Sequence, residues 1–269
     1  MGETPAHRAR KRFGQNFLHD QAIIEKIVAA ISPAKDDRII EIGPGKGALT
    51  EPLLEKVKQL DVVEIDRDLA NLLESLFTNH QSPLTNDKPK FTLHQLDALK
   101  LDLSGFACNQ LRIVGNLPYN ISTPLLFHLL SQANYIKDMI FMLQKEVVDR
   151  MVAGPGSKTY GRLSVMLQYG CEVTSLFSVK PGSFNPAPKV DSAVVRIVPD
   201  AERMRRVKDP VLLEHIVRDA FSQRRKTIRN SLKKRVEESI LAELGIDPGT
   251  RAENLSVDDY IALANRVKT

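Results

Sequence analysis

The sequence predicts an α/β fold, in which helices cover a mostly parallel sheet, followed by a small helical domain. Apolar runs such as Leu111–Val114 are typical of strands buried on both faces. The run Arg38–Ile42 leads into a glycine-rich turn and a helix, the order expected of an α/β unit. Beyond about Asp200 the composition shifts, and Arg203–Arg235 is rich in Lys and Arg. With 269 residues the chain can bury one substantial core and a small second one.

The composition is that of a globular protein, with 42% hydrophobic and 26% charged residues and a net charge of +5. The two cysteines, Cys108 and Cys171, lie far apart, and no C-x-x-C or spaced His pair accompanies them. We therefore expect neither a disulfide framework nor a metal site, which fits a reducing cytoplasm. No apolar run approaches the roughly 20 residues of a membrane span. Residues 1–17 lack the apolar core of a secretory signal, although their arginines leave a transit peptide open.

Residues 1–19 are expected to be a basic arm that ends in a docking segment. The polar pair Gln15 and Asn16 stands between Phe13 and Phe17, a pattern that indicates a segment lying on the protein and presenting its amides. A solubilising tail is the alternative. Asp20–Ile31 follows as an amphipathic helix with an aspartate at its N-cap.

The first predicted strand, Arg38–Ile42, is followed by glycines that indicate a ligand site. Gly43 and Gly45 let the backbone approach a ligand, and the helix beyond favours groups that accept from its free N–H donors. The G-x-G-x-G spacing departs from the G-x-G-x-x-G of dinucleotide folds. Glu41 beside the glycines suits a ligand that carries positive charge better than a phosphate.

The next two predicted strands end in acidic residues. Val62–Asp66 carries Glu64, which lies 64 − 43 = 21 positions beyond the first glycine, an offset that suits a carboxylate accepting from ribose hydroxyls. NAD enzymes share this offset, so it indicates a nucleoside cofactor without choosing one. Phe91–Gln95 is the third strand and leads to Asp97, which is either a ligand contact or the N-cap of the next helix.

The fourth strand leads to a polar and aromatic corner. Asn116 is expected at the carboxyl end of the strand, where open α/β sheets bind ligands. Pro118 holds the backbone extended so that no helix uses the Leu117 carbonyl, and Tyr119 adds an aromatic face. Together they form a receptor for a planar group that carries an NH2, such as adenine. The alternative is a strand-to-loop turn with a structural Asn and Pro.

Two further strands are expected after a helix at Ile121–Ser131 and a fifth strand at Asp138–Leu143. Cys171–Val179 and Ala193–Val198 are too close in sequence for a helical crossover, so we expect an antiparallel pair. Prolines between them leave Phe184 on a stiff loop near the strand ends. An aromatic anchor in the core is the alternative for this residue.

Residues 201–269 are expected to form a basic helical domain. Phe221, Ile228 and Leu232 recur at roughly helical spacing as a buried stripe. The density of arginine around them favours contact with a polyanion over the alternative of a solvated helix. The candidate contacts are Arg224, Arg225, Lys226 and Arg229, with Lys189 as a further cation that could meet a phosphate.

Four motifs resemble those of the rRNA adenine N6,N6-dimethyltransferase family: N-L-P-Y at 116–119, Q-N-F-L at 15–18, E-x-G-x-G-x-G at 41–47 and F-x-P-x-P-K-V-x-S at 184–192. They occur in the family's order, from Gln15 through the basic helix. The resemblance implies a class I methyltransferase dependent on S-adenosyl-L-methionine (SAM), with a Rossmann-like, seven-stranded, mostly parallel sheet and a small C-terminal helical domain. It implies that the partner is the 16S rRNA of the small ribosomal subunit, two neighbouring adenosines of which are dimethylated near the 3′ end. We expect a cytoplasmic monomer that needs no metal or membrane.

The resemblance also implies a role for each site residue. Residues 1–19 would include the segment over the cofactor, residues 20–200 the SAM-binding catalytic domain and residues 201–269 the RNA-binding domain. Tyr119 and Phe184 would stack on the target adenine, while Asn116 and the Leu117 carbonyl accept from its amino hydrogens. The residues implied in cofactor binding are Asn16, Leu18, Gly43, Gly45, Glu64, Asp97 and Asn116.

Three alternatives stay open. A macrolide-resistance relative that methylates large-subunit rRNA shares these motifs. A non-catalytic ribosome-assembly or transcription factor on the same fold is opposed by the presence of Asn116, Glu64 and Asp97. An NAD dehydrogenase is opposed by the glycine spacing and by the lack of an acid/base set for hydride transfer.

Overall fold

The computed structural model describes residues 15–78, 90–106, 110–223 and 225–267. The chain forms two compact units. The first comprises the chain up to Lys145 together with Leu176–Arg196, and the second comprises Glu146–Ser175 and the chain from Ile197 onward. The basic arm before Gln15 lies outside the described residues, as does Cys108.

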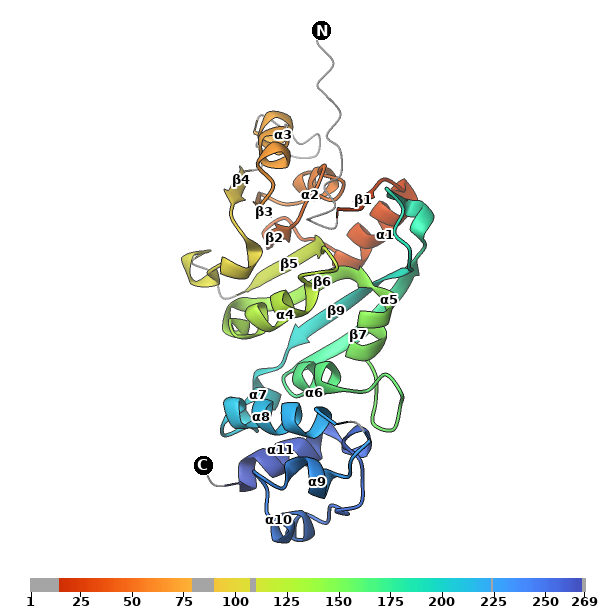
Figure 1. Cartoon of the computed structure of the whole chain (residues 1–269). Helices are drawn as coiled ribbons and strands as arrows, with labels where there is room; N and C mark the ends of the chain where they lie inside the picture. The colour runs from red at the N-terminus through yellow and green to blue at the C-terminus, as the bar shows by residue number, and fades with distance from the viewer. Residues whose placement is uncertain (1–14, 79–89, 107–109, 224, 268–269) are drawn as a thin grey trace. The chain divides into compact units, whose positions relative to one another are not determined.

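A seven-stranded sheet with the order β4-β3-β2-β5-β6-β9-β7 is the main feature of the fold (Figure 1). Its strands are β2 (Arg38–Ile42), β3 (Gln59–Glu64), β4 (Lys90–Gln95), β5 (Leu111–Asn116), β6 (Ile136–Gln144), β7 (Cys171–Val179) and β9 (Ser192–Pro199). β2 pairs in parallel with β3 and β5, β3 with β4, and β5 with β6. Because the strand order reverses between β2 and β5, their carboxyl ends flank a switch point of the kind that binds ligands in open α/β sheets.

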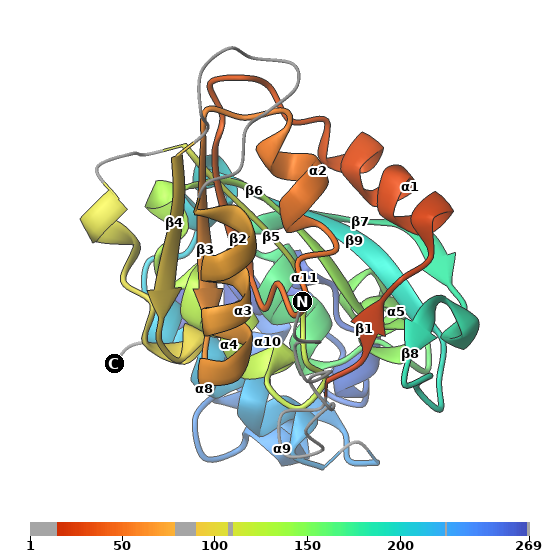
Figure 2. The same ribbon diagram turned by 90° about the horizontal axis from the view of Figure 1, so that it is seen from above.

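Helices of the first unit lie on both faces of the sheet, as Figure 2 shows. They are α1 (Gln21–Ile31), α2 (Thr50–Leu54), α3 (Arg67–Phe77) and α4 (Ser122–Leu130), with 3-10 turns η2 (Ala98–Lys100), η3 (Leu103–Phe106) and η4 (Ala133–Tyr135). One apolar cluster joins α1, α2 and α3 to the sheet through Ile39, Val62 and Val114. The buried Leu125 and Leu129 of α4 are not part of that cluster. The sheet is therefore covered as a mostly parallel sheet must be.

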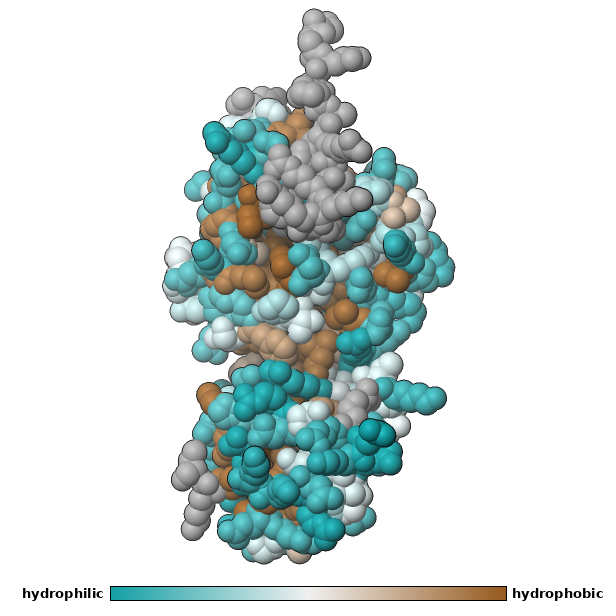
Figure 3. Space-filling view, viewed as in Figure 1, coloured by the Kyte–Doolittle hydropathy of each residue, from teal (hydrophilic) through white to brown (hydrophobic). Residues whose placement is uncertain are grey.

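The second unit is helical and includes the segment 146–175. Its helices are α5 (Lys145–Met151), α6 (Arg162–Gln168), α7 (Ala201–Arg205), α8 (Pro210–Phe221), α9 (Ile228–Leu232), α10 (Glu238–Glu243) and α11 (Val257–Arg266), with the turn η6 (Ala252–Asn254). The ring of Phe221 lies 6.2 Å from that of Tyr160 and 5.8 Å from that of Tyr260, which ties the segment around α6 to α8 and α11. The composition shift predicts a boundary near residue 200 and does not reveal such long-range ring contacts. On the face seen in Figure 3 these helices are mainly hydrophilic.

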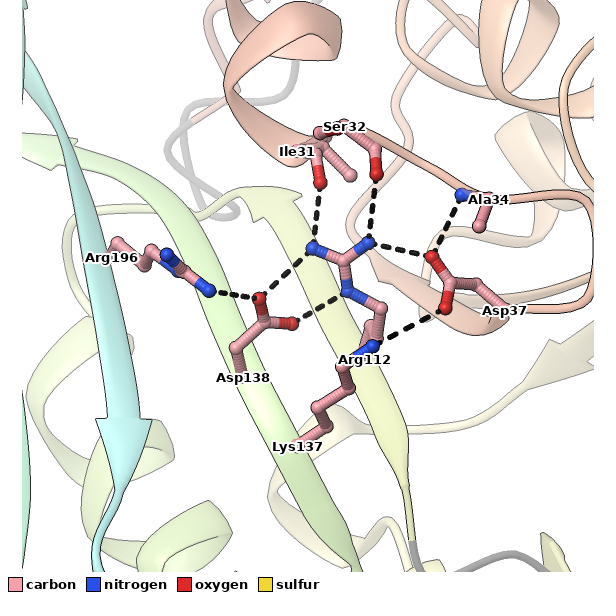
Figure 4. A network of polar contacts seen from close by, with 8 residues as sticks. All are labelled: Ile31, Ser32, Ala34, Asp37, Arg112, Lys137, Asp138 and Arg196. Carbon is pink, nitrogen blue, oxygen red and sulfur yellow. Dashed lines mark hydrogen bonds and ion pairs between the residues drawn. The ribbon is translucent and has the colours of Figure 1, made fainter.

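Arg112 anchors the amino end of β5 in a buried polar network (Figure 4). Its guanidinium donates to both carboxylate oxygens of Asp138 at 2.8 and 2.9 Å and to Asp37 at 2.7 Å. It also donates to the carbonyls of Ile31 at 2.6 Å and Ser32 at 3.3 Å, at the end of α1. All five N–H donors of the guanidinium are thus used. The network fixes α1 and two strands at the end of the sheet away from Asn116.

No helix among the described residues is long and apolar enough to cross a membrane.

Candidate active site

One open cavity lies at the carboxyl ends of β2, β3 and β5, within the first unit. It encloses about 1200 Å³ of unfilled space, part of it open to solvent. The predicted site residues that line it are Asn16, Leu18, Gly43, Gly45, Glu64, Asp97, Asn116, Leu117 and Tyr119.

The glycine turn after β2 brings the backbone to the cavity. Gly43 and Gly45 have φ angles of +67° and +59°, which side-chain-bearing residues rarely adopt. A Cβ on Gly45 would lie 3.0 Å from the ring of Phe17, so this glycine also lets the segment at residues 15–18 close over the turn. Both predicted glycines are therefore required by the local backbone.

Two buried carboxylates border the cavity beside the glycines. Glu41 is 1% exposed and accepts from the Thr50 hydroxyl at 2.6 Å. Burial raises the pKa of Glu41 to about 7, against the opposing hydrogen bond, and the charge of Glu64 adds to the rise. Burial likewise raises the pKa of Glu64, although it accepts from the backbone N–H of Asp66 at 2.8 Å. A cationic ligand would relieve the cost of ionising both groups.

Asp97 caps a turn and also lines the cavity. Its Oδ1 accepts from the backbone N–H of Leu99 at 3.0 Å, so it caps the 3-10 turn η2. The residue also lines the cavity. A carboxylate has acceptor capacity for more than one donor, so capping leaves it able to meet a ligand.

The segment at residues 15–18 lies against the cavity and is held by contacts with distant parts of the chain. Gln15 donates to the carboxylate of Asp66 at 3.1 Å, and the Asn16 carbonyl accepts from the side chain of Asn116 at 3.1 Å. The strand β1 (Phe17–Leu18) pairs antiparallel with β8 (Phe184–Asn185). The Q-N-F-L residues thus dock on the protein, with the Asn16 main chain reaching the end of β5.

Asn116 and Leu117 place two oxygen acceptors beside the cavity. Because the Asn116 Nδ2 donates to the Asn16 carbonyl, its Oδ1 is left as the acceptor, and no described residue donates to it. The backbone N–H of Leu117 donates to the Met142 carbonyl at 3.1 Å, whereas its own carbonyl has no donor among the described residues. Both oxygens can therefore accept from an amino group.

Tyr119 presents a half-buried ring to the same cavity. Its hydroxyl lies 2.8 Å from the Ser192 Oγ. Burial raises the pKa of the Tyr119 phenol, against the opposing hydrogen bond with Ser192, so the group is neutral at physiological pH. The ring can stack on a base but does not act as an anionic base itself.

Phe184 does not line the cavity, where a second stacking residue is expected. Its side chain is 3% exposed, belongs to the main apolar cluster and does not line the cavity. The backbone pairing of β8 with Leu18 turns the ring into the core. A second stacking face is therefore not presented in this structure, and the core anchor considered as the alternative describes the residue as it stands.

The predicted polyanion contacts do not share one continuous helix. α8 ends at Phe221 and α9 begins at Ile228, so the exposed Arg225 and Lys226 lie on the turn between them. Arg229 is exposed and pairs with Glu238 at 3.4 Å. Arg224 lies outside the residues whose side chains are described, and the exposed Lys189 belongs to the first unit.

Arg251 is a neighbour of these cations that sequence reasoning missed. An antiparallel bridge pairs Thr227 with Arg251, and the backbone N–H of Ile228 donates to the Thr250 carbonyl at 2.6 Å. These bonds bring the exposed Arg251 beside the turn that carries Lys226. A lone arginine outside a charge run gives no local signal, and only the backbone bridge reveals it.

No group of three or more His, Cys, Asp or Glu side chains among the described residues could hold a metal ion.

Comparison with known proteins gives consistent results for sequence and fold. A family model described as "Ribosomal RNA adenine dimethylase" matches residues 6–269. The chain is 54% identical to the "Ribosomal RNA small subunit methyltransferase A" of Pseudomonas savastanoi pv. phaseolicola, over 98% of this chain and 97% of the relative. It is 53% identical to the protein of the same name from a Marinomonas species, over 99% and 98%.

Two solved structures are similar over most of both chains. A dimethyladenosine transferase from Plasmodium falciparum matches with a TM-score of 0.77 and 27% identity, over 92% of this chain and 95% of that one. The 23S rRNA methyltransferase ErmE matches with a TM-score of 0.71 and 25% identity, over 94% and 100%.

Proposed function

The chain belongs to the ribosomal RNA adenine dimethylase family, and we propose that it dimethylates N6 of two adjacent adenosines near the 3′ end of 16S rRNA in the small ribosomal subunit. It is a SAM-dependent rRNA adenine dimethyltransferase with the class I fold. The small subunit is favoured over the large one because relatives named for it are 54% identical, whereas ErmE is 25% identical. We infer that the enzyme works as a monomer in the cytoplasm, where ribosomes are assembled.

The residues at the cavity fit SAM as the cofactor. The buried carboxylates of Glu41 and Glu64 favour a ligand with positive charge, such as the sulfonium and ammonium groups of SAM. They would repel a phosphate. The turn at Gly43 and Gly45 lets the backbone approach the ligand, and Asp97 provides a further acceptor. We propose that Glu64 accepts from the ribose hydroxyls and Asp97 from the adenine of the cofactor. Asn16 and Leu18 would cover the bound cofactor. SAM supplies an electrophilic methyl group.

The orientation of the Asn116 side chain carries the proposal for catalysis. Adenine N6 is a poor nucleophile because its lone pair is delocalised into the ring. The bond from Asn116 Nδ2 to the Asn16 carbonyl orients the amide and leaves Oδ1 free to accept from the amino hydrogens. The Leu117 carbonyl is a second acceptor. Accepting from both hydrogens draws the nitrogen toward tetrahedral geometry and localises the lone pair for attack. Once N6 has accepted the methyl group it carries a positive charge, so it is acidic and loses a proton to water.

The target base must leave its stack before it can reach these acceptors. We propose that Tyr119 receives it by stacking, since its ring lines the cavity beside Asn116. Phe184 could serve as a second face only if its buried ring left the core. Tyr119 is therefore the stacking residue that the structure supports.

We propose that the second unit binds RNA through the turn between α8 and α9. Arg225 and Lys226 are exposed and have no carboxylate partner among the described residues, whereas Arg229 is paired with Glu238. Arg251 adds a neighbouring cation through its backbone bridge to Thr227. Arg224 and Lys189 remain candidate contacts from the sequence. Contacts of this kind bind phosphates and are largely independent of base sequence.

Asn116→Ala tests the catalytic proposal. The variant should fold and bind RNA nearly as the wild type does, because phosphates and stacking supply ground-state affinity. Methyl transfer should fall by roughly 10² or more, the scale seen when one preorganised polar contact to a transition state is lost. Single-turnover kinetics with saturating SAM and RNA isolates this step. A rate within about threefold of the wild type would remove Asn116 from the mechanism.

A further inference from the structure

Tyr119 lies in a turn, where secondary structure does not fix its ring. Residues 117–121 belong to neither a helix nor a strand, and the turn closes with a 3.3 Å bond from the Ile121 N–H to the Pro118 carbonyl. The ring's far end meets the Ser192 Oγ at 2.8 Å. This contact is the one hydrogen bond that the described residues make with the Tyr119 side chain, and it bears on the direction in which the ring faces the cavity.

Ser192 is a fixed point for this contact. It is the first residue of β9, and its side chain is 0% exposed. The residue before it, Asp191, is held through both backbone and side chain: its carbonyl accepts from the Lys145 N–H at 2.9 Å, and its carboxylate pairs with Lys180 at 2.6 Å. A rigid strand end thus holds one partner of the bond, while the other partner lies in a turn.

The Ser192 hydroxyl has a single described partner, Tyr119. A hydroxyl buried in a strand costs desolvation free energy that alanine would avoid, as the neighbouring Ala193 and Val194 do. Tyr119 itself is half-buried, so its hydroxyl could turn to water if Ser192 were absent. The bond is therefore better explained by the placement of the Tyr119 ring than by a need for hydrogen bonds in the core.

We infer that Ser192 is a positioning residue for the target adenine: its hydroxyl holds the Tyr119 ring toward the cavity, so that a stacked base offers its amino group to Asn116. This inference rests on the proposed function, because it requires a base on Tyr119. Ser192 touches neither base nor cofactor and acts only through the tyrosine. Its loss should slow methyl transfer without changing the affinity for SAM.

A double-mutant cycle of Ser192→Ala and Tyr119→Phe tests the inference in the full-length chain. Each change removes one partner of the same bond and keeps the aromatic ring. Single-turnover methylation of unmethylated small subunits at saturating SAM should slow about three- to tenfold in each variant, the scale of one hydrogen bond. The double variant should be no slower than the slower single variant, because both changes remove one interaction. Ser192→Thr keeps the hydroxyl and should recover most of the rate.

Ser164→Ala is the matched control. It removes another hydroxyl of a residue that is 0% exposed, one that donates to the Arg150 carbonyl in the second unit. Its transfer rate should stay within about twofold of the wild type, so that loss of a buried hydroxyl alone is excluded as the cause.

Additive effects of Ser192→Ala and Tyr119→Phe, or a wild-type rate in either single variant, would overturn the inference. If Ser192→Ala does not fold, Tyr119→Phe decides alone, since it removes the same bond from a half-buried position. Failure of the proposed function looks different: the wild-type chain itself would then leave small subunits unmethylated.

Discussion

At the scale of single residues, the carboxylates beside the cavity link cofactor binding to pH. Glu41 is almost fully buried with a pKa of about 7, and the pKa of Glu64 is raised in the same direction. Glu41 is therefore partly protonated near pH 7, where an exposed carboxyl group is fully ionised. A cationic ligand favours the ionised form of Glu41 and must displace that proton when it binds.

SAM affinity should therefore rise as the pH increases from about 5.5 to about 7.5, by about tenfold or more, because Glu41 loses its proton across this range. The ligand's α-amino group has a pKa of about 7.7–8.0 and is still mostly charged at pH 7.5, so it does not cancel the effect. Isothermal titration calorimetry at each pH gives the affinity. Glu41→Gln should bind SAM more weakly and with a flatter pH profile. A flat profile for the wild type would show that Glu41 does not meet the cation.

At the scale of structural elements, β5 joins an anchor to a reactive end. Arg112 near its amino end holds α1 and β6, while Asn116 at its carboxyl end faces the cavity. The parallel pairing of β5 with β2 and β6 carries this rigidity along the strand. Sites built on strands hold their geometry better than sites on loops. A position at the end of β5 therefore suits Asn116, which must be placed precisely to meet the base.

Arg112→Met should lower the free energy of unfolding by about 3–5 kcal/mol, because it leaves Asp138 buried without its main partner. Arg196→Met is the matched control: Arg196 reaches the same carboxylate at 3.2 Å but is 48% exposed, so its loss should cost about 1 kcal/mol or less. Equilibrium unfolding in urea measures both. Equal stability of Arg112→Met and the wild type would contradict the anchoring role.

The turn between α8 and α9 should govern RNA affinity. Arg225→Glu with Lys226→Glu should weaken binding to small subunits and flatten its salt dependence by roughly one unit of slope per lost phosphate contact. Lys208→Glu is the control for Lys226, since both are exposed lysines of the second unit without a carboxylate partner among the described residues. Filter binding over a range of salt concentrations measures both terms. The single variants Lys226→Glu and Lys208→Glu each change one charge by the same amount, and equal effects of these two would leave only a general charge effect.

At the scale of the whole molecule, the sequence predicted what depends on local pattern. The parallel strands, the glycine turn and the residues Glu64, Asp97 and Asn116 at the strand ends follow from apolar runs and their polar termini, and each of these residues lines the cavity. The predicted neighbours β7 and β9 lie side by side in the sheet.

What could not be predicted depends on contacts between distant segments. The pairing of Leu18 with Phe184 decides which way that ring faces, whereas the sequence left both a stacking residue and a core anchor open. Ring contacts around Phe221 assign residues 146–175 to the helical unit. The bridge from Thr227 to Arg251 adds a cation to the basic turn. No composition shift or periodicity carries this information.

The most direct test of the account is mass spectrometry of rRNA from isolated small and large subunits incubated with the chain and isotope-labelled SAM. We predict labelled N6,N6-dimethyladenosine at two adjacent positions near the 3′ end of small-subunit rRNA, and none in large-subunit rRNA. Label confined to large-subunit rRNA, or a chain that binds SAM and labels neither, would contradict it.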